Sequence, residues 1–166
     1  MTTEKALLAA GCFWGVQAYF DQVPGVVATK VGYSGGTLSN PTYEQVCNHT
    51  TGHAETTEVA FDPAKISYPN ILRHFFRMHD PTQADGQGPD IGESYRSAIF
   101  YLNDRQRDEA KEALHLAQEN FKKPIVTEIT KAGPFYKAEE YHQKFFKKTG
   151  RGGCHIPYAP LVSVRG

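Results

Sequence analysis

The chain reads LLAAGCFWGVQAYF from Leu7 to Phe20. The four apolar residues that open this stretch are typical of a buried strand ending at Gly11, and the residues from Phe13 to Phe20 predict a helix. Cys12 therefore lies at a strand-to-helix junction. The first N–H groups of a helix lack intrahelical acceptors and carry partial positive charge, so a thiol placed there is acidified and nucleophilic. A small buried side chain that ends a strand is the alternative interpretation of Cys12.

Strand and helix patterns alternate along the rest of the chain. We expect strands at Val26–Tyr33, Thr56–Phe61, Ser97–Leu102 and Ile125–Thr130. We expect helices at Pro69–Met78, from an Asp104 cap to Phe121, and at Ala138–Lys148, with a short helical turn at Tyr43–Cys47. Asp80–Ser94 and residues 149–166 show no regular pattern. This order predicts an α/β (α+β) two-layer sandwich with a ferredoxin-like core, in which helices cover a mixed sheet, followed by a long C-terminal coil.

Length and composition exclude several classes of protein. A chain of 166 residues fits one domain, 1–166. Its 18 basic and 18 acidic side chains give zero formal charge, which argues against a nucleic acid or an anionic membrane as partner. No segment approaches the roughly 20 apolar residues that span a bilayer, and no signal peptide is recognisable. We therefore expect a monomeric cytoplasmic protein.

The sequence contains three cysteines, an odd number that does not make a disulfide framework. Cys154 follows two glycines in the expected mobile tail, 149–166, which would let its thiol move toward a partner as a resolving cysteine must. A tail thiol without function is the alternative. Cys47 is more typical of a packed structural thiol. The histidines near these cysteines show no metal-ligand spacing, so we expect neither a metal nor a cofactor.

A set of short motifs, taken together, resembles the A-type peptide methionine sulfoxide reductases. They occur in the family's order and extend from about Leu7 to His142. The motifs are Gly11-Cys12-Phe13-Trp14-Gly15, Gly32-Tyr33-Ser34-Gly35-Gly36, Pro41-Thr42-Tyr43, Gly52-His53-Ala54-Glu55, His79-Asp80-Pro81-Thr82, Asp90-Ile91-Gly92, Tyr95-Arg96-Ser97 and Tyr141-His142-Gln143. The chain departs from the family at Glu93-Ser94, where Thr-Gln is common; an additional carboxylate there could change peptide preference or proton supply.

The resemblance implies reduction of methionine-S-sulfoxide, free or in proteins, by an active-site cysteine with thioredoxin as the usual reductant. Carried over by position, Cys12 is the nucleophile, and Phe13 and Trp14 form the pocket for the substrate methyl group. The same correspondence makes Glu55 the acid. It gives supporting roles to three further residues, namely Tyr43, Tyr95 and Asp90.

The chemistry requires these residue types even without the family. A sulfoxide oxygen leaves poorly unless it is protonated while a nucleophile attacks the sulfur, and a carboxyl group held neutral at pH 7 by a raised pKa can supply that proton. We expect desolvation beside Trp14 to raise the pKa of Glu55. One buried methyl group contributes only about 0.8 kcal/mol, which is too little to separate sulfoxide from thioether. Donors directed at the oxygen can discriminate by about 10⁴–10⁵.

The reaction would leave Cys12 as a sulfenic acid, which condenses with a nearby thiol. We expect Cys154 to be that thiol and a disulfide between the two to be the substrate of thioredoxin, whereas Cys47 is too firmly placed to travel. Two other hypotheses are a cysteine hydrolase, with His53 or His142 as the base, and a thiol redox sensor without enzymatic activity.

Overall fold

The computed structural model describes residues 2–145. Cys154 and the expected tail, 149–166, lie outside these residues, as does the end of the helix predicted at Ala138–Lys148.

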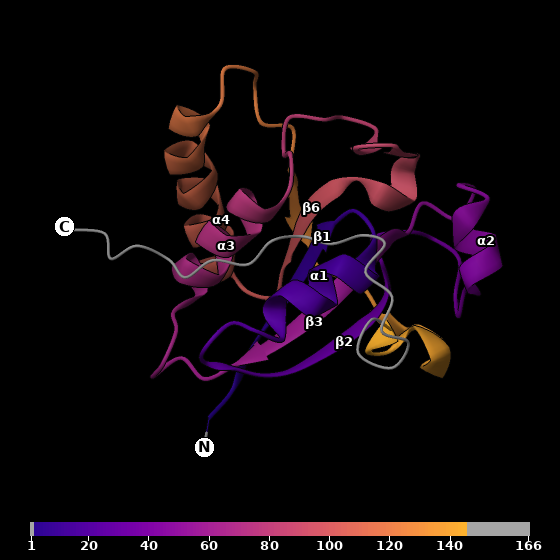
Figure 1. Cartoon of the computed structure of the whole chain (residues 1–166), viewed down its shortest axis with the longest axis horizontal. Coiled ribbons are helices and arrows are strands. Elements are labelled where there is room, and N and C mark those ends of the chain that lie inside the picture. Colours follow the sequence, from indigo (N-terminus) through magenta and orange to yellow (C-terminus); the bar gives the residue numbers. More distant parts are fainter. Residues whose placement is uncertain (1, 146–166) are drawn as a thin grey trace.

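A six-stranded mixed sheet forms the centre of the molecule (Figure 1). Its order is β7-β6-β1-β3-β2-β8, with β6 and β7 parallel and the other neighbours antiparallel. β1 lies inside the sheet and ends at Ala10, so the junction with Cys12 emerges from the core. The bounds are β1 (Glu4–Ala10), β2 (Val26–Ser34), β3 (Ala54–Phe61), β6 (Ser97–Tyr101), β7 (Glu128–Lys131) and β8 (Tyr136–Lys137).

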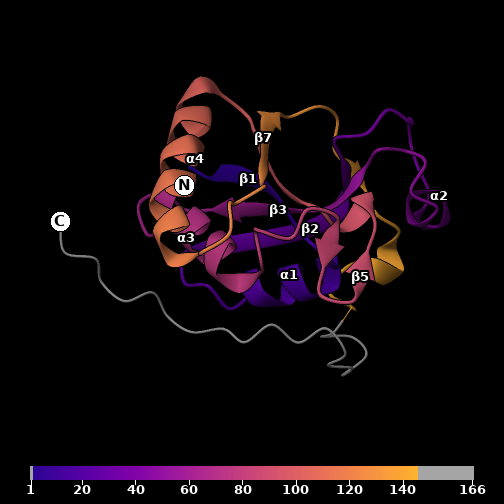
Figure 2. The same ribbon diagram turned by 90° about the horizontal axis from the view of Figure 1, so that it is seen from above.

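Three helices cover one face of this sheet: α1 (Phe13–Phe20), α3 (Tyr68–Met78) and α4 (Asp104–Ala117). Alternate strand residues, such as Leu8, Val59 and Ile99, pack against them in the main core. α3 and α4 lie side by side (Figures 1 and 2). The opposite face contributes Leu7 and Phe100 to a smaller cluster that the segment around Phe135 covers. The predicted two-layer α+β architecture is confirmed.

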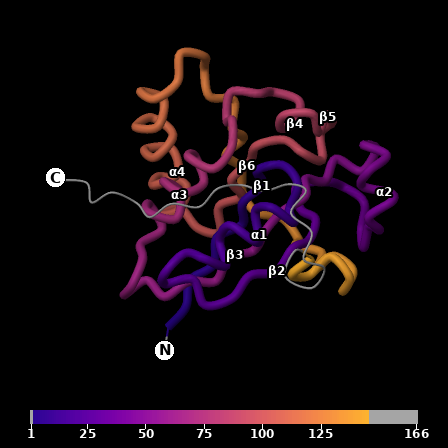
Figure 3. Tube along the Cα trace, viewed as in Figure 1, coloured from indigo at the N-terminus to yellow at the C-terminus, as the bar shows by residue number. Residues whose placement is uncertain are grey.

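A short hairpin, β4 (Gly86–Gln87) and β5 (Asp90–Ile91), lies within the segment expected to be irregular. A turn of 3-10 helix, η1 (Glu93–Tyr95), follows it directly. The hairpin and helix α2 (Tyr43–Cys47) lie toward the same end of the molecule (Figures 2 and 3). None of the described helices combines the length and the apolar character needed to cross a membrane.

The helix predicted at Ala138–Lys148 is absent from Ala138 to Lys144, and Phe145 alone among its described residues is helical. From Ala138 to Lys144 the chain forms a 3-10 turn, η3 (Glu140–His142), and Lys144 has a φ of +56°. The reason is a long-range contact, because the Gln143 side chain bonds both backbone groups of Val31 on β2, at 3.0 and 2.9 Å. The acidic and basic residues at the two ends of the segment favour a helix through its dipole, but they do not predict the contact between Gln143 and Val31.

Other boundaries, at α4 and β7, also differ from those expected. The cap of α4 is Asn103, whose side chain accepts from the Gln106 backbone at 2.8 Å, and the helix ends at Ala117 before a 3-10 turn, η2 (Gln118–Asn120). β7 begins at Glu128 rather than Ile125. The backbone of Ile125 bonds the Gln118 side chain at 2.8 Å instead of a neighbouring strand.

Candidate active site

Cys12 caps the N-terminus of α1, and its side chain is half-buried. Gly11, just before it, has a φ of +90°, and a Cβ at that position would lie 2.9 Å from the Gln87 side chain. The β4–β5 hairpin is therefore packed against the strand-to-helix junction. This arrangement presents Cys12 where the sequence predicts it, at the first turn of a helix beside a loop that carries Asp90.

Glu55 lies near the start of β3 with 2 % of its surface exposed. The Phe13 backbone N–H donates to its Oε1 at 3.1 Å, and Oε2, also buried, has no hydrogen-bond partner among the described residues. Burial raises the pKa of Glu55 to about 8; the Phe13 N–H opposes this rise, and the charge of Asp90 adds to it. The pKa of Glu55 is thus raised by burial, in the direction that the sequence predicts, and the hydrogen-bond partner of the carboxyl group is the backbone of Phe13.

Phe13 and Trp14 follow Cys12 directly and are held by aromatic neighbours. Phe13 is buried, with its ring 5.7 Å from that of Tyr33. The Trp14 indole N–H donates to His142 Nδ1 at 2.9 Å, and its ring stacks on Phe145 at 3.8 Å. Contacts from the far end of the described chain therefore hold the Trp14 ring, and Phe13 is held by Tyr33 and by the His142 ring, 5.2 Å away.

Tyr43 begins α2, and Tyr95 ends η1. Burial is the main cause that raises the pKa of each phenol, and the nearby charge of Glu55 raises both further. Each hydroxyl therefore stays protonated at neutral pH and can donate a hydrogen bond. The two tyrosines reach the neighbourhood of Glu55 from separate segments of the chain, as their assignment to one site requires.

Asp90 and Glu93 place two carboxylates near this region, and they differ in their contacts. Asp90 is half-buried on β5, and its charge acts on Glu55 and on Tyr95. Glu93 is exposed and accepts from the Gly52 backbone N–H at 3.1 Å. The departure at Glu93-Ser94 thus ties η1 to the loop that leads into β3.

Cys47, expected to be a packed structural thiol, lies beside two of the candidate site residues. It is half-buried at the end of α2, and its thiol adjoins Tyr43 and Tyr95. Burial raises its pKa, while the two hydroxyls partly offset that rise. The contact of Cys47 with Tyr95 depends on how α2 packs against η1, and no sequence pattern predicts that packing.

The two histidines considered as bases have other partners. His53 Nδ1 accepts from the Gly36 backbone at 3.0 Å, and its Nε2 bonds the Leu38 carbonyl at 2.7 Å. His142 Nδ1 accepts from Trp14, and its buried Nε2 has no hydrogen-bond partner among the described residues. Between residues 2 and 145, no three His, Cys, Asp or Glu side chains are grouped to hold a metal ion.

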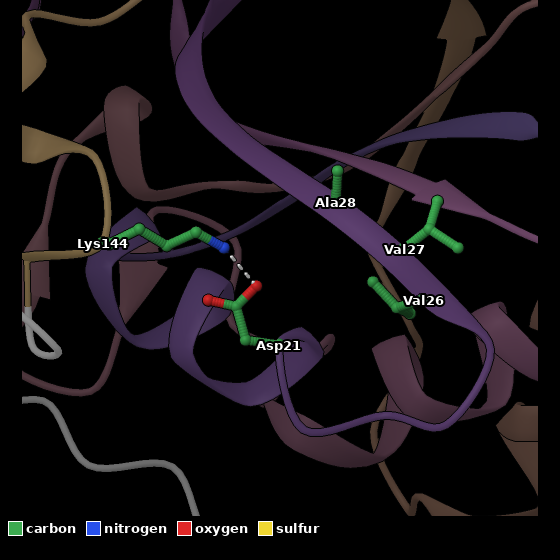
Figure 4. A pocket seen from close by; sticks show the side chains of 5 residues that line it. All are labelled: Asp21, Val26, Val27, Ala28 and Lys144. Atoms are coloured by element: carbon green, nitrogen blue, oxygen red, sulfur yellow. Dashed lines mark hydrogen bonds and ion pairs between the residues drawn. The ribbon is translucent and has the colours of Figure 1, made fainter.

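Two cavities lie on the other flank of α1, around Lys144. One of about 220 Å³ is lined by Asp21, Lys144 and three β2 residues, and Figure 4 shows the Lys144–Asp21 ion pair at 2.6 Å. The other, of about 280 Å³, adjoins Trp14 and Phe145. Cys12 and Glu55 line neither cavity, and Trp14 is the candidate site residue that lines the second.

The family model described as "Peptide methionine sulfoxide reductase" matches residues 4–165. The chain belongs to the peptide methionine sulfoxide reductase family. It is similar to the A-type enzyme of Methanothermobacter thermautotrophicus, with 53 % identity over 98 % of this chain and 96 % of that one. Among solved structures, reduced Mxr1 from Saccharomyces cerevisiae has a TM-score of 0.89 and 33 % identity, and covers 95 % of this chain and 93 % of its own. Mxr1 in complex with Trx2 has a TM-score of 0.63 and 27 % identity over 84 % of each chain.

Proposed function

We propose that this reductase converts methionine-S-sulfoxide, free or in proteins, to methionine by transfer of oxygen to Cys12. The observation that carries the proposal is the buried Glu55 carboxyl group. It is bonded to the first N–H after Cys12 and has an unpartnered Oε2. A neutral acid and a nucleophile at the same helix start are what protonation of a departing oxygen requires.

In the first step the Cys12 thiolate attacks the sulfoxide sulfur while Glu55 donates its proton to the oxygen. The S–O bond of the substrate breaks as the bond between Cys12 Sγ and the substrate sulfur forms, and the oxygen leaves as hydroxide. Hydroxide then attacks Cys12 Sγ, the S–S bond breaks and methionine leaves. Cys12 becomes a sulfenic acid, so that the substrate sulfur gains the two electrons that Cys12 loses. The partial positive charge at the start of α1 favours the thiolate.

The substrate is held by two different kinds of contact. Phe13 and Trp14 receive the methyl group, while the hydroxyls of Tyr43 and Tyr95 and the Glu55 proton point at the oxygen. The polar contacts provide the discrimination, because a site built to hydrogen-bond an oxygen rejects a thioether far more strongly than an apolar wall does. Membership of the A type supports a preference for the S epimer.

Recycling would use Cys154. Its thiol condenses with the sulfenic acid, releases water and forms a Cys12–Cys154 disulfide, which a thioredoxin dithiol then reduces. The structure of the yeast relative Mxr1 with Trx2 supports the choice of reductant. Peptide mapping of enzyme oxidised with substrate tests the pairing, and a Cys12–Cys47 bond would refute it.

The reaction is tested with separated epimers of a methionine sulfoxide peptide and dithiothreitol. Wild type should reduce the S epimer, Cys12→Ser should be inactive, and Glu55→Gln should be strongly impaired. Glu58→Gln, on the same strand and paired with Lys5 at 3.7 Å, is the matched control and should behave as wild type. Turnover of an ester without dithiol would indicate a hydrolase. Oxidation of Cys12 without methionine formation would indicate a sensor.

A further inference from the structure

Glu139 bridges two parts of the candidate site through one carboxylate. Its Oε1 accepts from the Tyr33 hydroxyl at 3.0 Å, and its Oε2 accepts from the Tyr43 backbone N–H at 3.1 Å. The residue lies between β8 and η3, about 100 positions along the chain from both partners. Glu139 therefore connects the C-terminal part of the described chain to the first residue of α2.

The first partner, Tyr33, is a rigid anchor. It has no exposed surface and stands opposite Glu55 in the β2–β3 register, so the two side chains share one face of the sheet. Through Glu139, the start of α2 is tied to the strand pair that carries the proposed acid. α2 has only five residues, too few for a helix to be stable alone, so its position depends on such contacts.

Glu139 is itself fixed on both sides. The Ala138 backbone donates to Val31 at 2.9 Å, and the Gln143 side chain bonds Val31 and Ala138. Between these anchors, the His142 ring lies 4.4 Å from that of Tyr43. The carboxylate is thus presented from backbone that is pinned to β2.

We propose that Glu139 is a positioning residue that holds Tyr43 so that its hydroxyl faces the sulfoxide oxygen. The inference rests on the proposed function, which gives Tyr43 that role. Glu139 does not touch the substrate in this account. It acts through the backbone of Tyr43, and its loss lets α2 shift relative to Glu55. A displacement of about 1 Å at a reacting group can lower a rate by up to about 100-fold.

The test is a double-mutant cycle in single turnover, with methionine formation measured under substrate excess and no reductant. Glu139→Ala should lower the rate by about 10-fold to 100-fold. In the Glu139→Ala background, Tyr43→Phe should cause little further loss, because the hydroxyl is already misplaced. Additive losses, or an unchanged rate in Glu139→Ala, would overturn the proposal.

Three further variants allow the test to distinguish a positioning role from loss of folding or loss of charge. Glu139→Gln can accept from the Tyr43 N–H and donate to the Tyr33 hydroxyl, so it should stay within about threefold of wild type. If Glu139→Ala does not fold, Tyr33→Phe replaces it in the cycle, with a smaller loss expected and the same non-additivity. Glu44→Ala removes an exposed carboxylate from α2 itself and should leave the rate unchanged. If Glu44→Ala lowers the rate as much as Glu139→Ala does, the loss is due to the removed charge and the proposal is overturned.

The outcomes also separate this inference from the proposed function. If Tyr43→Phe alone has no effect while Cys12→Ser is inactive, the reaction stands and the roles of Tyr43 and Glu139 both fail. If wild type forms no methionine from either epimer, the proposed function itself fails.

Discussion

The Glu55 carboxyl group receives one backbone hydrogen bond, stands near the charge of Asp90 and is almost fully buried. Desolvation disfavours its charged form more than the single N–H favours it, so the pKa rises to about 8. The proton therefore stays on Glu55 at neutral pH. The consequences differ for activity and for stability.

The chemical step should slow as the pH rises through about 8, because Glu55 then loses the proton that it donates. Glu55→Gln should be slower by about 10²–10⁴-fold and should lack this alkaline decline. Single-turnover rates from pH 6 to 10, expressed per Cys12 thiolate, check both. An unchanged alkaline decline in Glu55→Gln would assign the titration to another group.

The same carboxyl group should destabilise the fold at high pH. Its pKa in the folded state, about 8, lies above the ordinary value of 4.5, so stability falls as the pH rises between these values. Glu55→Gln removes this loss and should be more stable than wild type by a few kcal/mol at pH 9, with little difference at pH 5. Urea unfolding at both pH values measures the effect. An equal difference at both would contradict it.

At the scale of elements, the junction between β1 and α1 depends on Gly11. Gly11→Ala would strain a φ of +90° and drive a methyl group into Gln87, which holds the hairpin in place. We expect a loss of roughly 1–3 kcal/mol in stability, with lower activity because Asp90 moves. Gly88→Ala, at a φ of +55° with open space around it, is the control for backbone strain alone. If Gly11→Ala and Gly88→Ala lower stability equally, backbone strain alone explains the loss and the contact with the hairpin does not contribute.

The C-terminus of α3 should be sensitive to acid. His79 bonds the Phe75 carbonyl at 2.6 Å and Ser97 Oγ at 2.7 Å, and burial lowers its pKa to about 4. Its stabilising contribution should therefore be lost as the pH falls from 6.5 toward 4, by about 3 kcal/mol in all. Because the titration of Glu55 changes the free energy of unfolding with pH in the opposite direction, unfolding is compared in a Glu55→Gln background. His79→Gln should flatten the pH slope there, and an unchanged slope would contradict the assignment.

Local patterns predicted the elements whose packing is decided nearby. Phe13–Phe20 is a helix as expected, because its apolar spacing and the following Pro24-Gly25 are local signals. The segment after Ala138 failed because Gln143 pairs with Val31, 112 positions away. Contacts between residues that are distant in the sequence also escape local patterns at the candidate site. Motif resemblance named Cys12 and Glu55, but the bridge through Glu139 exists only once β8, β2 and α2 are assembled.

At the scale of the whole molecule, the site draws on β1 and α1, the start of α2, β3, the β4–β5 hairpin and the segment that ends at Phe145. Chemistry on Cys12 and recycling through Cys154 are separate steps of the proposal. Cys154→Ser should therefore form about one methionine per enzyme at the wild-type rate, and then stop when thioredoxin is the reductant. Continued turnover with thioredoxin would assign recycling to another thiol, and Cys47→Ser in the same background would then identify it.

The most direct test of the account is the protonation state of Glu55. Carbon-13 NMR of the labelled glutamate carboxyl groups in Cys12→Ser protein, assigned by comparison with the Glu55→Gln/Cys12→Ser double variant, follows its titration. We predict a midpoint near 8, well above the ordinary value of 4.5. A midpoint at the ordinary value would mean that Glu55 is ionised at neutral pH and cannot supply the proton.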